Sequence, residues 1–268
     1  MINVASLWIG DRLGEIEQIS ARSFLDTGHR LTIYAYGPLE GVPEGVTVLD
    51  AEPIFSGRRI LRYPGGSPAL HSNLFRYAMM AATGEFWVDL DIIAMRRFDF
   101  SSDFIFGFEV PGRVNNAVLR LPKNSPTLGR LVTFRADTRG NPPDAGALRR
   151  AANWITTGGR GSRITDWSHG ATGPRALTAF LRETGEITHS LPQETFYPVH
   201  WREAERLVTR GGITTRDIGD ESYGVHLWGF HLRQALARLS GGRAEEGSFL
   251  ADMRARLTRR ELVRITPA

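Results

Sequence analysis

Residues 86–93 read FWVDLDII, and this stretch decides the fold class of the chain and the kind of site that it carries. Its apolar start predicts a buried strand over Phe86–Leu90, and the glycine before it, Gly84, ends a predicted helix over Ala69–Ala82. A helix that leads into a buried strand is the repeating unit of a parallel sheet. The stretch therefore predicts an α/β protein with a mostly parallel central sheet flanked by helices.

The segments before this unit repeat the alternation of strand and helix. We expect strands over Ile2–Ile9, Arg30–Tyr36 and Val46–Leu49, with a helix over Leu13–Leu25 between the first two. The second half is a mixture of helices and strands. There we expect strands over Phe104–Val110, Ala117–Leu121 and Tyr223–Trp228, helices over Ser125–Arg135, Pro143–Trp154, Pro174–Leu181 and Phe249–Val263, and a basic loop over Thr156–Arg163.

Composition narrows the function classes. The 268 residues include no cysteine, which excludes a disulfide framework, a thiolate zinc site and a cysteine nucleophile. The net charge is +4, Lys123 is the only lysine, and the arginines are scattered rather than clustered, so we expect no nucleic-acid partner. No apolar run approaches the ~18 residues of a membrane helix, and the N-terminal segment does not resemble a signal peptide. We expect one cytoplasmic domain over residues 1–268, because no repeat or change in composition divides the chain.

Asp89 and Asp91 are the most informative charged residues. Two carboxylates two residues apart on an extended backbone point to the same side, and at the carboxyl end of a parallel strand they face the crevice where such sheets bind ligands. Like charges at this distance repel unless a cation lies beside them, and Mg²⁺ or Mn²⁺, shared with substrate phosphates, is the natural occupant. The alternative is a pair of solvated acids in a turn after the strand.

The helix that precedes this strand carries a second polar group of residues. Ser72, Asn73 and Arg76 lie on it, and Asn73 and Arg76 are neighbours on one face because they are three residues apart. An amide and a guanidinium together suit a ligand rich in hydroxyls that also bears phosphate. The alternative is a surface helix with an ordinary arginine.

These residues resemble a known family. Ser72–Tyr77 (SNLFRY) followed by Gly84–Asp91 is similar to the S-D-x-x-R-Y … G-G-x-Y-x-D-x-D block of family 32 glycosyltransferases, the group of α-1,4-galactosyltransferase-like enzymes. The chain departs from this block in having Asn73 for aspartate, Glu85 for the second glycine and Trp87 for tyrosine. Another family block, Ser6–Gly10, precedes this one, and the others follow it in the family's order: Asn115–Leu119, His169–Pro174 with Thr178, Phe196–Val199 with Trp201, and His226–Trp228.

The resemblance implies a GT-A fold and a metal-dependent glycosyltransferase that retains anomeric configuration. Residues 1–100 would be the half that binds nucleotide-sugar and metal, and residues 101–268 the acceptor-side half. The implied donor is a nucleotide-sugar, with UDP the expected nucleotide, and the implied reaction moves a hexose or an N-acetylhexosamine to a glycan or lipid-linked acceptor, as in bacterial polysaccharide biosynthesis. A divalent ion suits this chemistry, because it stabilises the charge that builds up on the departing phosphate.

The resemblance also implies roles for individual residues. The expected ligands of Mn²⁺ or Mg²⁺ are Asp89, Asp91 and His226, with Asp91 as the direct ligand. The expected donor-binding residues are Trp8, Ser72, Asn73, Arg76 and Asp89. The expected acceptor-side residues are Asn115, Asn116, His169 and Trp228. Structural roles remain alternatives for Trp8 and His226, and ordinary loop positions for the polar acceptor-side residues. The catalytic residue stays open, since a mechanism in which the departing phosphate guides the acceptor hydroxyl needs no protein nucleophile.

Three further interpretations remain. The altered residue Asn73 favours a non-catalytic protein that binds nucleotide-sugar. A DxD phosphatase is disfavoured, because that fold normally has the motif on its first strand and uses a later lysine. The basic segment Met253–Arg264, with Arg254, Arg256, Arg259, Arg260 and Arg264, would rest on an anionic membrane at its inner face, or else be a solvated helix face. The donor sugar, the base, the acceptor and the oligomeric state cannot be read from the sequence.

Overall fold

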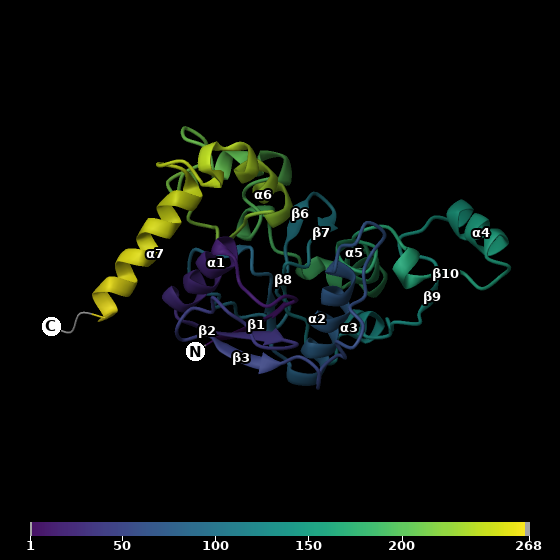
Figure 1. The fold of residues 1–268 in the computed structure, drawn as a ribbon. Helices are drawn as coiled ribbons and strands as arrows, with labels where there is room; N and C mark the ends of the chain where they lie inside the picture. Colours follow the sequence, from purple (N-terminus) through teal and green to yellow (C-terminus); the bar gives the residue numbers. More distant parts are fainter. Residues whose placement is uncertain (1, 266–268) are drawn as a thin grey trace.

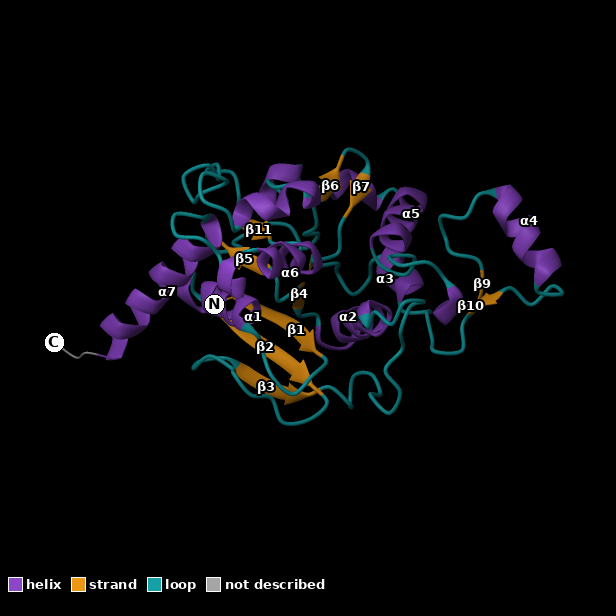
Figure 2. Cartoon of the chain, turned by 45° about the horizontal axis from the view of Figure 1, so that its top comes forward, coloured by secondary structure: helices purple, strands orange, loops and turns teal. Residues whose placement is uncertain are grey.

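The structure is a computed structural model that describes the backbone of residues 2–265 and the side chains of residues 2–258. Its central sheet has five strands in the order β3-β2-β1-β4-β8 (Figure 2). Neighbouring strands among β1 to β4 pair in parallel, and β8 at one edge is antiparallel to β4. These strands are β1 (Ile2–Trp8), β2 (His29–Ala35), β3 (Thr47–Asp50), β4 (Phe86–Val88) and β8 (Val118–Leu119). The prediction of a mostly parallel sheet is confirmed.

Helices cover both faces of this sheet, as a parallel sheet requires. On one face, Val4, Phe86 and Val88 pack in the same apolar cluster as residues of α1 (Glu15–Asp26). On the other face, the alternate residues Ala5, Leu7 and Trp87 pack with those of α2 (Ala69–Thr83). Helix α2 ends where Gly84 takes a left-handed conformation with φ 76°, which glycine adopts without strain.

The second half joins short antiparallel strand pairs to helices and adds little to the central sheet (Figure 1). The strand pairs are β5 (Ile92–Ala94) with β11 (Gly224–His226), β6 (Phe108–Val110) with β7 (Arg113–Val114), and β9 (Arg139–Gly140) with β10 (Ser162–Arg163). The α-helices are α3 (Pro126–Leu131), α4 (Ala147–Thr156), α5 (Pro174–Thr184), α6 (Gly229–Arg238) and α7 (Phe249–Ile265). Short 3₁₀ helices span Ile164–Asp166, Glu186–His189, Gln193–Thr195, Trp201–Leu207 and Ser240–Gly242.

Several predicted elements have different bounds in the structure. The predicted strand Phe86–Leu90 ends at Val88. The predicted strand Phe104–Val110 is a strand only over its last three residues, because its first part pairs only through isolated bridges, Ile105 to Arg120 and Gly107 to Leu191. The predicted strand Tyr223–Trp228 is limited to β11, because Trp228 takes a φ of 55° and caps the start of α6, a helix that the sequence did not predict.

Helix α7 turns its described apolar residues into the core. Phe249, Leu250, Met253 and Leu257 are buried in a cluster with residues of β11 and α6, and Arg254 pairs with Glu15 of α1 at 3.1 Å. The side chains of Arg259, Arg260 and Arg264 lie outside the described residues. Membrane contact through this helix therefore stays a prediction. In the described part of the helix, the apolar face is buried against the core.

His29 in β2 predicts a pH dependence of stability. Its side chain is 3% exposed, Nε2 accepts a hydrogen bond from the Phe98 backbone N–H at 3.0 Å, and Nδ1 lies 3.2 Å from the Phe24 carbonyl oxygen, to which it can donate. Burial lowers the pKa of His29 to about 4. Between that value and the unfolded pKa of about 6.5, the unfolded chain binds a proton that the folded chain excludes. Folding stability therefore falls as the pH drops from about 6.5 towards 4.

The His29→Gln variant should show this loss less steeply. In urea titrations between pH 4.5 and 7, the free energy of unfolding of both proteins should decrease as the pH is lowered. We expect the slope of this decrease to be smaller in the variant than in the wild type, by up to about 1 kcal/mol per pH unit. His71, whose pKa burial also lowers to about 4, accounts for part of the slope that remains. Equal slopes in the two proteins would show that His29 is not the group that resists protonation.

Candidate metal centre and ligand pocket

Two carboxylates and an imidazole converge at the carboxyl edge of the sheet. Asp89 follows β4, Asp91 lies two residues on, and His226 ends β11. One ligand atom from each lies within 4.8 Å of the others, and Asp91 Oδ2 is 3.2 Å from His226 Nε2. Oxygen and imidazole ligands in this number fit a divalent cation such as Mn²⁺ or Mg²⁺. The structure thus brings together the three residues that the sequence analysis assigned to metal.

The backbone that carries the two carboxylates has a different conformation from the predicted one. The backbone N–H of Ile92 donates to the carbonyl oxygen of Asp89 at 3.1 Å, which closes a turn over residues 89–92. The prediction that both aspartates lie on extended strand is therefore wrong. The chain turns after Val88 because Ile92–Ala94 leaves the central sheet to pair with β11, where His226 lies opposite Ile92. That same pairing delivers the imidazole to the carboxylates.

The start of α6 fixes Asp91. The backbone N–H of Gly229 donates to Asp91 Oδ2 at 2.8 Å, and a helix N-terminus favours negative charge. A Cβ at position 229 would lie 3.0 Å from that oxygen and 2.9 Å from Nη1 of Arg233. Only glycine therefore allows the helix to approach the carboxylate this closely without a shift.

Burial and neighbouring charges set the protonation of this cluster. Burial by itself would raise the pKa of Asp91, but His226, the Gly229 N–H and Arg233 outweigh it and hold that pKa at about 2. Burial would lower the pKa of His226, and the charges of Asp91, Asp89 and Glu109 outweigh it and raise that pKa. Burial raises the pKa of Asp89, against the opposing effect of Arg76. Asp91 is thus the more strongly anionic of the two carboxylates.

Arg76 on α2 holds Asp89 in place. The Arg76 side chain is 4% exposed, its Nη2 lies 2.8 Å from Asp89 Oδ1, and its Nη1 donates to the carbonyl oxygen of Asn116. Its guanidinium lies over the ring of Trp87, 4.5 Å from the centroid, and the Trp87 indole N–H donates to the same Asp89 oxygen at 2.7 Å. Asp89 therefore receives two hydrogen bonds from side chains that α2 and β4 fix.

Asn73 sits in a network of amides and hydroxyls. Its Nδ2 donates to Thr172 Oγ1 at 3.2 Å and to the Tyr63 hydroxyl at 3.4 Å, and its Oδ1 accepts from Asn116 Nδ2 at 3.0 Å. Both ends of the amide are in use. The amide that stands where the resembled family has aspartate is therefore accommodated by its neighbours, and it orients Asn116 beside Arg76.

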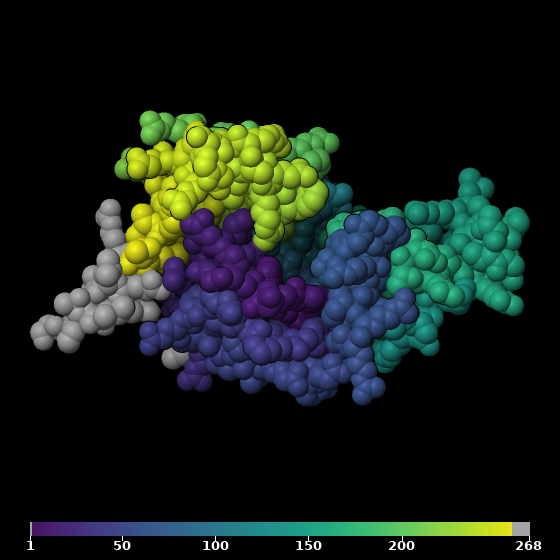
Figure 3. Space-filling view, viewed as in Figure 1, coloured from purple at the N-terminus to yellow at the C-terminus, as the bar shows by residue number. Residues whose placement is uncertain are grey.

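A pocket of about 740 Å³ opens beside these groups. In the space-filling view a hollow lies between the segments around α2 and α6 (Figure 3). The pocket is lined by the expected Asn73, Arg76, Asp89, Asn115, Asn116, His169, His226 and Trp228, and by Glu109, Trp201, Phe230 and His231, among others. Segments far apart in the sequence thus form one concave site.

Two expected donor residues do not line this pocket. Trp8 is half-buried, and its indole N–H donates to the Arg12 carbonyl oxygen at 2.9 Å. Ser72 is half-buried on α2. Their roles in binding a donor remain predictions.

The lining also includes residues that the sequence analysis gave no role. Glu109 is buried, accepts a hydrogen bond from Asn115 Nδ2 and pairs with Arg113. An acidic residue between two apolar positions of a strand is unusual, and this pattern could have marked Glu109 in the sequence as a candidate site residue. Phe230 and His231 come one residue after the H-x-W block, and nothing else in the sequence marks them.

Comparisons with known proteins match part of the second half of the chain. A family model described as "Alpha 1,4-glycosyltransferase conserved region" matches residues 165–242, the span that holds His169, Trp201, His226 and Trp228. Among solved structures, "PaToxG Glycosyltransferase" is similar to this chain with a TM-score of 0.46 and 14% sequence identity over 70% of each chain. No curated protein matches the chain. None of the described helices is both long and apolar enough to cross a membrane.

Proposed function

We propose that the chain, whose residues 165–242 match the alpha 1,4-glycosyltransferase conserved region, is a glycosyltransferase of that family. In this proposal it moves a hexose or N-acetylhexosamine from a nucleotide-sugar, with UDP as the nucleotide, to a glycan or lipid-linked acceptor with retention of configuration. The observation that carries this proposal is the convergence of Asp89, Asp91 and His226 beside a pocket of about 740 Å³, which Asp89 and His226 line. That volume lies within the range of roughly 300–1,000 Å³ that small-molecule sites occupy.

The metal centre supports the donor half of the reaction. Asp91, held anionic by the Gly229 N–H and by His226, is the first metal ligand, and His226 and Asp89 complete the set. When bound, Mn²⁺ or Mg²⁺ supplies Lewis-acid stabilisation to the diphosphate that leaves the sugar. Arg76 also has a free hydrogen-bond donor, because its buried Nε has no partner among the described residues. This N–H can donate to an oxygen of the nucleotide-sugar.

The pocket supports a division between donor and acceptor sides. Its walls come from both halves of the chain: Asn73, Arg76 and Asp89 from residues 1–100, and Asn115, Asn116, His169 and Trp228 from residues 101–268. Trp228 packs on His226 with ring centroids 4.1 Å apart, so the aromatic wall borders the metal ligands. We assign the first group to the donor sugar and the second to the acceptor.

Melting temperatures test the donor site. We expect a rise only when UDP and Mn²⁺ are both present, and not with GDP or with either component alone; a ligand at about 100 times its Kd stabilises by about 2.7 kcal/mol. Mass spectrometry of products from UDP-glucose, UDP-galactose and their N-acetyl forms then identifies the sugar. No shift with any nucleotide would overturn the donor assignment.

Turnover separates this proposal from its alternatives. We expect slow, metal-dependent hydrolysis of the preferred nucleotide-sugar in the absence of acceptor. Binding without any turnover would favour a non-catalytic nucleotide-sugar-binding protein. Hydrolysis of a generic aryl phosphate, with no nucleotide effect, would favour a phosphatase.

A further inference from the structure

Residues 139–163 form an arm that projects from the body of the molecule. Its stem is the antiparallel pair of β9 and β10, in which Arg139 lies opposite Arg163, and its tip is helix α4. Figures 1 and 2 both show α4 at the end of the molecule opposite to α7, with no other element beside it. No residue of α4 is buried. The arm is thus a helix presented on a short stem.

The helix at the tip exposes an apolar face. Leu148, Ala151, Ala152 and Ile155 recur at the spacing of one helical face, a pattern that normally packs against a core. Here Leu148 is 90% exposed, Ile155 78% and the adjacent Trp154 62%. Half of the large apolar side chains that are exposed among the described residues lie on this ten-residue helix. An exposed apolar face on a projecting helix is typical of a site that binds another protein or a membrane.

The charge around this face has one sign. Residues 145–165 contain Arg149, Arg150, Arg160 and Arg163 and no aspartate or glutamate. The single acid of the arm, Asp144, pairs at 2.6 Å with Arg175 at the start of α5. The positive charge near the tip is therefore not compensated within the arm.

We propose that the arm docks on an anionic lipid bilayer. Leu148, Trp154 and Ile155 would enter the boundary between headgroups and acyl chains, and the arginines would contact lipid phosphates. Basic amphipathic helices with exposed tryptophan bind this interface, and anionic lipid attracts each basic side chain near the surface. The charge argues against a second copy of this chain as the occupant, because two such arms repel each other.

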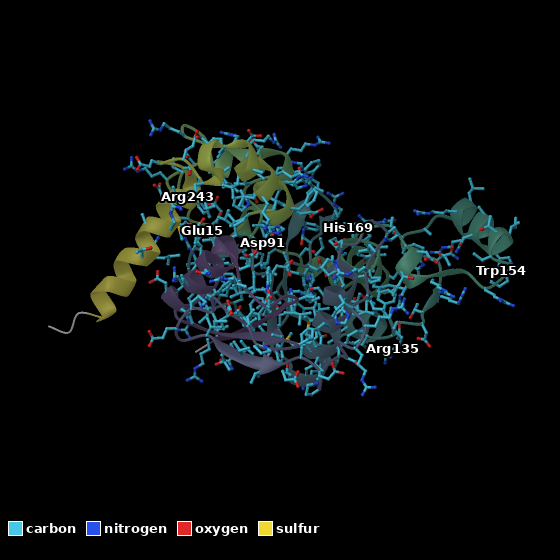
Figure 4. All side chains as sticks on the ribbon, viewed as in Figure 1. Glu15, Asp91, Arg135, Trp154, His169 and Arg243 are labelled. Carbon is cyan, nitrogen blue, oxygen red and sulfur yellow. The ribbon has the colours of Figure 1, made fainter. Side chains whose placement is uncertain are left out.

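The position of the arm relates docking to the acceptor. The chain runs from β10 through the 3₁₀ helix Ile164–Asp166 to His169, which lines the pocket. In the view of Figure 4, His169 lies between Asp91 and the arm, whose far end carries Trp154. Docking of the arm would bring the acceptor side of the pocket towards the bilayer and so favour a lipid-linked acceptor. The statement about the acceptor rests on the proposed function.

Vesicle sedimentation tests the docking. The full chain should bind phosphatidylcholine vesicles that contain phosphatidylglycerol, not phosphatidylcholine alone, and bind less as salt rises. The double variant Leu148→Gln/Ile155→Gln should lower the partition coefficient at least about tenfold, and Arg149→Gln/Arg160→Gln should do so by a similar factor. The matched control is Leu49→Gln on β3, where the side chain is 45% exposed, and it should bind as the wild type does.

Three outcomes would overturn the proposal. They are no binding to the anionic vesicles, binding that the apolar double variant leaves unchanged, and a wild-type dimer that this variant converts to a monomer in light scattering. The melting shift with UDP and Mn²⁺, measured on the same samples, reports the donor site separately. A retained shift without vesicle binding refutes the docking alone, and vesicle binding without a shift refutes the donor site alone.

Discussion

Replacing Arg76 by alanine should lower the free energy of unfolding by about 3 kcal/mol, because it leaves a largely buried carboxylate without its partner. Arg76 is almost fully buried and pairs with Asp89, whose side chain is 29% exposed. That partial exposure places the expected cost at the lower end of the range for broken buried pairs. The carbonyl oxygen of Asn116 loses its donor in the same variant, and Trp87 loses a cation over its ring.

Urea denaturation at neutral pH measures this cost. Without Arg76, burial would favour the protonated form of Asp89 still more, so the deficit should shrink as the pH falls and the folded chain takes up that proton. The matched control is Arg120→Ala, which breaks the exposed pair with Asp103 and should cost below about 1 kcal/mol. If the two variants are equally stable, Arg76 does not support Asp89 as the geometry indicates.

Replacing Asp91 by asparagine should weaken Mn²⁺ binding by at least about 100-fold and remove sugar transfer to the same degree. Loss of a residue that only hydrogen-bonds to a metal ligand already lowers metal affinity roughly 10–100-fold. Asp91 is expected to be a direct ligand, and its lowered pKa makes it the more strongly anionic of the two carboxylates. Asparagine has the same shape and keeps an oxygen for the Gly229 N–H, so the variant should remain folded.

Titration of Mn²⁺ followed by electron paramagnetic resonance measures the affinity, and product formation measures the transfer. The control is Asp103→Asn, an exposed acid that pairs with Arg120 away from the cluster, and both readouts should match the wild type. Unchanged Mn²⁺ affinity in Asp91→Asn would remove this residue from the metal site, whatever the activity.

The outline of the site could be predicted, but its geometry could not. Asp89, Asp91 and His226 could be named together from the sequence, and the structure places their ligand atoms within 4.8 Å of one another. The sequence pattern indicated extended backbone where the chain turns, and it gave no sign of α6, whose first N–H donates to Asp91 across 138 positions in the chain. A helix that begins directly after a short strand gives no separate periodic signal, and the residue that starts it is a glycine.

The sequence by itself determined the local elements: the alternation of β1, α1 and β2, the end of α2 at Gly84, and the apolar strand before Asp89. These follow from side-chain period and from glycine's freedom at left-handed positions, which act between near neighbours. Only the tertiary structure decided that β5 leaves the sheet for β11, that Asn73 meets Thr172, and that the apolar face of α4 stays uncovered. A helical period shows that a face is apolar, but what covers that face depends on contacts between segments far apart in the chain, which no local pattern records.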